Sequence, residues 1–154
     1  MGRINCLNGS FDSLIADLRK KSASAPETIR KAVDKAGDVL VEETTKSIVK
    51  ESVVDTGALL QSVKKGKAQA TGGGYKIEVW PQGMRRDKHH RKAARNETIG
   101  FVNEHGRKWS GTGKNKTAAK NGYKGRPFMA NAAKAAEERV GDVMLDVLER
   151  DLNG

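Results

Sequence analysis

Three histidines are the only imidazole groups that this sequence could offer to a metal ion: His89, His90 and His105. His89 and His90 are adjacent, so on regular structure their rings point in different directions, and no carboxylate or cysteine stands at a ligand spacing from them. The single cysteine, Cys6, leaves no partner for an intrachain disulfide and no cysteine metal cluster. We therefore expect no metal site.

The segment 111–114, Gly-Thr-Gly-Lys, is similar to the end of a phosphate-binding loop. Such a loop needs a further glycine upstream, and a serine or threonine after the lysine to hold magnesium. Here the upstream glycine is missing and Asn115 follows Lys114. No Gly-x-Ser-x-Gly nucleophile elbow occurs either. The sequence thus predicts no cofactor and no catalytic residue, and we expect a protein that is not an enzyme.

The excess of positive over negative charge is confined to one segment of the chain. Residues 84–126 hold 13 of the 29 lysines and arginines but only 3 of the 19 acidic residues, so they carry the entire net charge of +10. Charge segregated in this way indicates a polyanionic partner, either nucleic acid or an acidic protein surface. A solvated, mobile loop is the alternative.

Two aromatic residues within the basic segment, Trp109 and Tyr123, could stack on nucleic-acid bases. No helix-turn-helix, zinc-finger or RNA-recognition signature is present, so any binding to DNA would be through phosphates, sequence-independent and sensitive to salt. We favour Trp109 as a packing anchor at an interface. The residues that we expect to face a protein partner or DNA are Arg85, Arg86, Lys88, Arg91, Lys92, Arg107, Lys108, Trp109, Lys114, Lys116, Lys120, Tyr123 and Lys124.

Helical periodicity governs both ends of the chain. Phe11, Leu14, Ile15 and Leu18 follow the i, i+3, i+4, i+7 spacing of a short amphipathic helix. The segment 24–27, Ser-Ala-Pro-Glu, is typical of a capping box with proline in the first turn, so we expect a second helix of about six turns to begin there. A third, with an apolar face of alanine and valine, should begin after residues 126–127.

The middle of the chain favours short strands. We expect Asp55 or Thr56 to cap a short helix that contains Leu59, and we expect strands over 63–71 and 75–80 around a turn at the three glycines 72–74. A further strand is expected over 98–102. The sequence thus predicts a single α+β domain over 1–154, in which two long helices pack a small antiparallel sheet, with long basic loops at about 82–97 and 107–124.

Three motifs in this order are similar to those of one known family. Residues 54–59 (Val-Asp-Thr-Gly-Ala-Leu), with Ser62-Val63, match an element that ends the family's long helix, although Ser52-Val53 stand where Ala-Pro is usual. Residues 101–106 match its aromatic-x-x-Glu-x-Gly element, and residues 126–128 (Arg-Pro-Phe) match the opening of its last helix. The chain resembles the small bacteriophage neck and minor tail-component proteins of the lambdoid type.

This resemblance implies a virion structural protein of the tail-completion or tail-terminator kind. Such proteins work as rings, often of six subunits, so it implies a homo-oligomer between the head connector and the tail tube, with DNA as a further partner in the channel. It also implies synthesis in the bacterial cytoplasm; no apolar run is long enough to cross a membrane. A free, sequence-independent nucleic-acid-binding protein is the alternative. The residues that the resemblance makes fold-defining are Asp55, Thr56, Gly57, Leu59, Glu104, Gly106, Arg126, Pro127 and Phe128.

Overall fold

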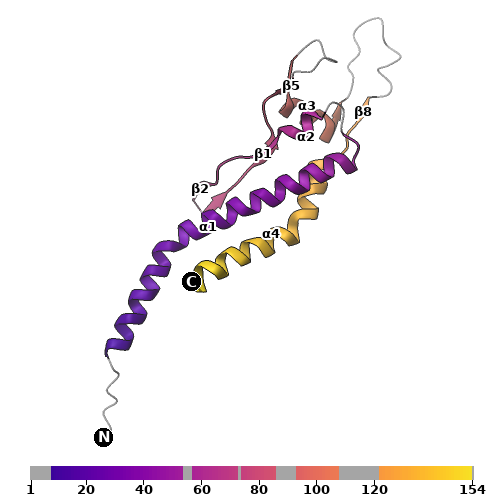
Figure 1. Ribbon diagram of the computed structural model, residues 1–154. Coiled ribbons are helices and arrows are strands. Elements are labelled where there is room, and N and C mark those ends of the chain that lie inside the picture. The colour runs from indigo at the N-terminus through magenta and orange to yellow at the C-terminus, as the bar shows by residue number, and fades with distance from the viewer. Residues whose placement is uncertain (1–7, 54–56, 73, 86–92, 108–121, 154) are drawn as a thin grey trace, which may run out of the picture.

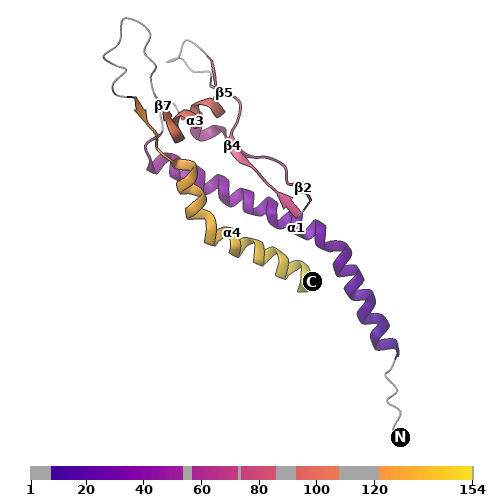
Figure 2. The same ribbon diagram turned by 180° about the vertical axis from the view of Figure 1, so that it is seen from behind.

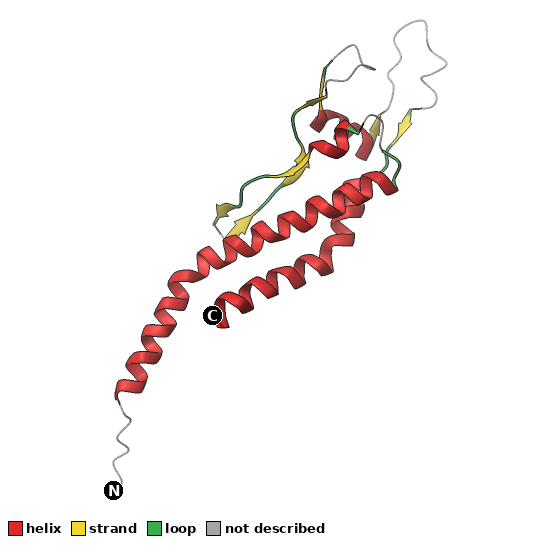
Figure 3. Ribbon diagram, in the orientation of Figure 1, coloured by secondary structure: helices red, strands yellow, loops and turns green. Residues whose placement is uncertain are grey.

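Two long helices lie side by side, and a hairpin and two short helices are arranged along one of them (Figure 1; Figure 2). The computed structural model describes residues 8–53, 57–72, 74–85, 93–107 and 122–153. Helix α1 (Asn8–Lys50) packs against helix α4 (Phe128–Asn153). Figure 3 shows how few residues of the described chain are in strands. The predicted α+β class, with two long helices and short antiparallel strands, is confirmed.

Helix α1 corrects the prediction of two separate N-terminal helices. It runs without interruption through Pro26, so residues 24–27 do not begin a helix. Proline removes one backbone donor and its ring crowds the carbonyl four residues earlier, which a helix accommodates by bending. The helix is visibly bent between the part beside α4 and the part that continues beyond it (Figure 1).

The hairpin is present, but it is divided into two ladders. Strand β1 (Val63–Lys65) pairs with β4 (Val79–Pro81), and β2 (Gln69–Thr71) pairs with β3 (Gly74–Lys76), both antiparallel. Three residues separate β1 from β2, whereas two residues separate β3 from β4. The side of the hairpin that contains β1 and β2 therefore carries one extra residue, as in a β-bulge. The predicted strands over 63–71 and 75–80 are therefore each interrupted by a bend.

Gly37 lets the hairpin lie close to α1. A methyl group at this position would approach Cδ1 of Ile77 to 2.6 Å, because that side chain reaches over the helix. Lys65, from β1, secures the same contact by binding Asp34 Oδ2 at 2.7 Å and Asp38 Oδ1 at 2.8 Å. Its pKa is affected most by burial, which lowers it, but the hydrogen bonds to both aspartates outweigh burial and raise it.

Helix α3 (Asn96–His105) occupies the segment for which a strand over 98–102 is predicted, so that prediction is wrong. The β-branched residues there suggested a strand, but tertiary contacts decide otherwise. Ile99 packs against the core and the Cα of Gly100 lies against Pro81, where a methyl group would come within 2.8 Å of the proline ring. Helix spacing puts these two neighbours on a buried side, which shows how weakly local preference constrains a short segment.

The core lies where the C-terminal end of α1 meets the hairpin and α4. Its buried cluster consists of Ile48, Val53, Leu59, Val63 and Phe128, of which Ile48 and Phe128 are fully buried. Leu59 belongs to helix α2 (Ala58–Ser62), whose N-cap position is Gly57 with φ 76° and no capping side chain. The expectation that Asp55 or Thr56 caps this helix concerns residues outside those described, and the N-cap position itself belongs to the glycine.

Candidate assembly surface

The C-terminal end of α1 is closed by a Schellman motif and by an arginine from a distant segment. Val53 N–H donates to Ile48 O and Ser52 N–H to Val49 O, both at 3.0 Å, while Ser52 takes φ 53°. Nη1 of Arg126 donates to the carbonyls of Glu51 and Ser52. A guanidinium suits this position because the helix C-terminus carries partial negative charge.

The N-terminal end of α4 is closed by a carboxylate from α3. Oε2 of Glu104 accepts from Met129 N–H at 2.8 Å, and Oε1 accepts from Ala130 N–H at 3.0 Å. Both donors belong to the first turn of α4, where backbone N–H groups have no partner within the helix. A negative charge is also favoured there by the helix dipole. Glu104 therefore joins α3 to α4 by a charge-assisted cap.

Two glycines allow α3 and the approach to α4 to come this close. Gly106 ends α3 with φ 77°, and its N–H donates to Val102 O. At Gly125 an added methyl group would lie 2.5 Å from the carbonyl oxygen of Glu104, so only glycine fits against that backbone. The next residue, Arg126, donates its N–H to Asn103 O at 2.7 Å.

The structure thus places residues of all three motifs in one region, which we call the motif junction: Glu51, Ser52, Leu59, Glu104, Arg126 and Phe128. Leu59 and Phe128 meet in the core, while Glu104 and Arg126 close two helix ends. Pro127 precedes α4 and its carbonyl accepts from Asn131 N–H. Asp55 and Thr56 lie outside the described residues.

Two short ladders at this end of the molecule bracket the predicted basic loops. Strand β5 (Met84–Arg85) pairs with β6 (Ala94–Arg95), and β7 (Gly106–Arg107) pairs with β8 (Tyr123–Lys124). Helix α3 joins β6 to β7 and contacts both. The ladders therefore bring the ends of segments 86–92 and 108–121 to opposite ends of one ten-residue helix.

Only four of the predicted interface residues belong to the described chain. Arg85 is half-buried in β5, Arg107 and Lys124 are exposed, and Tyr123 lies in β8. The other nine fall outside the described residues: Arg86, Lys88, Arg91, Lys92, Lys108, Trp109, Lys114, Lys116 and Lys120. Whether these residues contact protein or DNA stays a prediction.

Apolar side chains are exposed next to the ladders. Phe101 of α3 is 64% exposed and its ring lies 4.6 Å from that of His105, centroid to centroid. Met84 of β5 is 46% exposed and lines an open cavity of about 410 Å³ together with Trp80, Arg95 and Glu97. Exposed aromatic and thioether side chains of this kind are enriched at protein interfaces rather than on inert surface.

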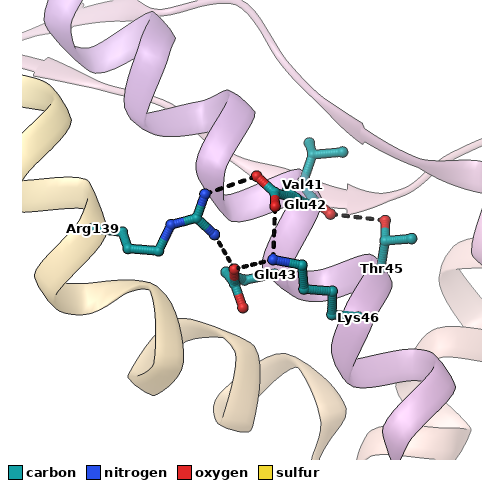
Figure 4. Close-up of polar contacts among 6 residues, drawn as sticks. All are labelled: Val41, Glu42, Glu43, Thr45, Lys46 and Arg139. Carbon is teal, nitrogen blue, oxygen red and sulfur yellow. Dashed lines mark hydrogen bonds and ion pairs between the residues drawn. The ribbon is translucent and has the colours of Figure 1, made fainter.

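An ion-pair cluster ties α1 to α4 away from the motif junction. Arg139 of α4 reaches Glu42 and Glu43 of α1, and Lys46 bridges the same two carboxylates at 2.7 and 2.9 Å (Figure 4). Hydrogen bonds from Arg139 and then from Lys46 lower the pKa of Glu42 to about 2. The pKa of Glu43 is also lowered, chiefly by its hydrogen bond from Lys46.

Within the described ranges, no group of three or more histidine, cysteine or acidic residues could hold a metal ion. The same ranges contain no helix long and apolar enough to cross a membrane. The ring of His105 lies tilted against that of Phe101, while His89 and His90 lie outside the described residues.

A comparison with protein-family models gives a match over the first part of the chain. Residues 12–85 match a family model described as "Bacteriophage HK97-gp10, putative tail-component". The matched residues, just under half of the chain, are therefore similar to the HK97-gp10-like family of phage tail components. No curated protein and no solved structure matches the chain.

The family match covers the first part of the architecture. It extends from the first turns of α1 through the hairpin to β5, and it includes the motif at residues 54–59. Glu104 and Arg126 lie beyond it. Their similarity to the family therefore rests on the motifs, and their structural role rests on the contacts at the two helix ends.

Sequence reasoning missed the residues that join α1 to α4. Arg139 binds Glu42, and Asp151 accepts from Thr28 Oγ1 at 2.9 Å and from Lys31 Nζ at 3.3 Å. Each pair is separated by about a hundred residues or more, so no spacing rule connects them. The only local signal was an excess of charge on the outer faces of both helices.

Proposed function

We propose that this protein is a structural component of the phage head–tail junction, where copies assemble into a ring between the head connector and the tail tube. The observation that carries the proposal is the family match, whose description is that of a phage tail component. In this proposal the protein is a neck, tail-completion or tail-terminator protein of the virion, with no catalytic role.

The placement of the basic segments supports this assembly role. Both are anchored by a two-stranded ladder and both ladders flank α3, so they leave the body at the same end of the molecule. Exposed Phe101 and Met84 lie on the same two elements. A segment anchored at both ends can contact an adjoining ring or subunit through the side chains between its anchors. DNA in the channel is a second surface that such lysines and arginines could face.

The test replaces the longer basic segment without disturbing its ladder. Because Arg107 pairs with Tyr123, residues 108–122 can be exchanged for Asn-Gly, the dipeptide favoured in two-residue hairpin turns. We expect the variant to fold with unchanged helical circular dichroism but to leave heads and tails unjoined when it is the only copy in an infected cell. The matched control exchanges the same residues for a Gly/Ser segment of equal length, which separates the loss of side chains from the loss of length.

Electron microscopy of the particles supplies the decisive readout. A ring of this protein at the head–tail junction of wild-type particles, together with free heads and free tails from the variant, supports the proposal. Normal infectious particles from the Asn-Gly variant would contradict it. A protein absent from virions that binds DNA as a monomer, with affinity falling steeply as salt rises, would establish the nucleic-acid-binding alternative instead.

A further inference from the structure

The open cavity of about 410 Å³ between β4, β5 and the start of α3 is lined by both apolar and charged side chains, and we call it the α3 pocket. Trp80 and Met84 supply apolar surface, and Arg95 and Glu97 are exposed beside them. Phe101, which is 64% exposed, follows Glu97 by one turn and so lies on the same side of α3. Apolar side chains gathered on the surface in this way are typical of an interaction site.

Hydrogen bonds from Asn96 hold the α3 pocket in shape. Asn96 is 5% exposed, its N–H donates to Gly83 O, and its Nδ2 donates to Gln82 O, both at 2.9 Å. Gln82 N–H in turn donates to Ser62 O at 2.8 Å, which ties the end of β4 to α2. The pocket is therefore formed before anything binds, which lowers the cost of ordering on association.

Charge around the α3 pocket indicates what it receives. Arg95 is exposed and forms no ion pair with any described residue. Residues 84–126, to which it belongs, carry the net charge of +10. Opposite charges across an interface select the correct partner. An apolar side chain flanked by carboxylates therefore matches the pocket, whereas DNA phosphates would leave its apolar lining uncovered.

One exposed apolar residue elsewhere on this chain has that pattern. Apart from Met84 and Phe101, the large apolar side chains that are exposed in the described ranges are Ile29, Val49 and Leu145. No carboxylate stands three or four residues from Ile29 or Val49 in the sequence. Asp142 and Glu149 stand at these spacings from Leu145, which makes them its neighbours on the surface of α4.

Leu145 lies on the outer side of α4, on a strip that we call the α4 ridge: Glu138, Asp142, Leu145 and Glu149. It follows the fully buried Ala136 by nine positions, about two and a half turns of helix, so it points away from the buried side. Leu145 is 57% exposed, and the three carboxylates are exposed as well. Among the described residues, none forms an ion pair with these carboxylates.

We propose that Leu145 of one copy occupies the α3 pocket of a second copy, where Arg95 lies beside Asp142 and Glu149 of the first. A chain cannot fill its own pocket, because Glu104 of α3 caps the first turn of α4 and Leu145 lies about 25 Å further along that helix at 1.5 Å per residue (Figure 1). The contact joins two different surfaces, so it repeats head to tail and closes into a ring when the rotation permits. The inference rests on the ring assembly proposed above and names the two surfaces that build it.

Substitution of the inserted side chain is the first arm of the test. Sedimentation of the full chain over a concentration series should show association that Leu145→Asp weakens by roughly tenfold or more, because the leucine no longer gains from burial. Val49→Asp is the matched control. Val49 is 56% exposed on α1, away from both surfaces, so its change should leave association as it is. Both variants should keep the helical circular dichroism of the wild type.

The sign of the charge effects supplies the second arm. Arg95→Glu should weaken association, and combining it with Asp142→Lys and Glu149→Lys should restore it. Glu97→Gln should strengthen association, because it removes the one carboxylate that lines the pocket and faces those of the ridge. Glu137→Lys changes an exposed carboxylate that lies off the ridge, and should have no comparable effect.

Fluorescence of Trp80 reports on the α3 pocket itself. A Trp109→Phe background leaves Trp80 as the only tryptophan of the chain. As the concentration rises, its emission should shift to shorter wavelength, because an apolar side chain replaces water beside the indole. The shift should be absent when Leu145→Asp is added to the same background.

The outcomes separate this inference from the proposed function. A wild-type chain that stays monomeric at every concentration would overturn the inference, as would assembly that is insensitive to Leu145→Asp. Trp80 emission that shifts with a short DNA duplex, while the chain remains a monomer, would assign the pocket to nucleic acid instead. A ring at the head–tail junction built without Leu145 would refute the inference alone. Association through Leu145 in a protein that is missing from that junction would refute only the proposed function.

Discussion

Ser52 is the one residue other than glycine in the described chain with a positive φ. It occupies the position after the end of α1 where glycine is usual, because a side chain there crowds the backbone. The motif junction holds it in place: its carbonyl accepts from Arg126, and the following Val53 is buried in the core. Local strain is therefore maintained by contacts to α4 and not by the helix itself.

Replacing Ser52 with glycine should stabilise the protein by about 0.5–1 kcal/mol, since glycine adopts this conformation without strain while gaining some freedom in the unfolded chain. Urea unfolding followed by circular dichroism measures the difference. Ala23→Gly, at an exposed position inside α1, is the control and should destabilise by up to about 1 kcal/mol. Equal destabilisation by both changes would show that Ser52 is not strained.

Glu104 caps the first turn of α4 from a different helix, whereas a capping side chain normally belongs to the helix end that it caps. Glu104→Ala removes both acceptors from the first turn of α4 and should cost about 1–2 kcal/mol of unfolding free energy. Glu104→Gln keeps an acceptor oxygen but not the charge, so its cost should be smaller. Thermal and urea unfolding report both values. Glu137→Ala, which alters an exposed carboxylate on α4, should change stability by less than about 0.5 kcal/mol.

At the scale of elements, the contact between α1 and α4 is held by charged residues at intervals along its length. Asp151 binds at one end, Arg139 in the middle, and Asn131 donates to Glu51 at 2.9 Å near the motif junction. Small residues fill the space between the helices, with Ala32, Ala132 and Ala136 almost completely buried. Small side chains allow close approach but bury little apolar surface each. Ion pairs are thus prominent in specifying how the helices align.

Acid should weaken this alignment in a defined pH range. The pKa of Glu42 is about 2 in the folded protein against 4.5 for the free group, because Arg139 and Lys46 stabilise its charged form. A lowered carboxyl pKa contributes stability that is fully present above pH 4.5 and is lost as the pH falls toward 2. Urea unfolding at a series of pH values should show this loss.

Arg139→Gln supplies the comparison for the acid series. Its unfolding free energy should lie below that of the wild type at pH 7 and should converge on it between pH 4.5 and 2. Added salt should reduce the difference at pH 7, because both side chains are largely exposed and the interaction is screened. Parallel pH profiles for the two proteins would mean that the cluster contributes nothing measurable.

At the scale of the whole molecule, the structure separates a body from a projection. The body contains the core and the motif junction, with the ladders that lead into the basic segments, and the projection is the part of α1 before Thr28. The net positive charge belongs to residues 84–126, whose described parts include α3 and the two ladders beside it.

Deleting residues 1–23 should leave the body folded, because the core and the contacts between α1 and α4 lie outside that segment. The truncated chain begins with Ser24-Ala25-Pro26-Glu27, which can act as the capping box that the longer helix overrides. We expect a cooperative transition with a midpoint within about 3 °C of that of the monomeric full-length chain. Calorimetry measures this midpoint. A large fall in the midpoint would mean that the projection packs on its own body.

The sequence by itself determined the features that depend on neighbouring residues. Helical periodicity located the two long helices, and the three glycines 72–74 located the turn of the hairpin. The excess positive charge of residues 84–126 followed from counting charged residues. The motif at 54–59 indicated the family whose model residues 12–85 then matched. These signals lie within windows of a few turns, where backbone geometry and side-chain type are directly coupled.

Only the tertiary structure determined how those elements contact one another. Residues 98–102 became helix because Ile99 and Gly100 had a core to face, and α1 continued through Pro26 despite a local signal to start anew. Glu104 and the first turn of α4 are 25 positions apart, and Arg126 and Ser52 are 74 apart. Contacts over such separations leave no periodic trace in a sequence, because they depend on the packing of whole helices in three dimensions.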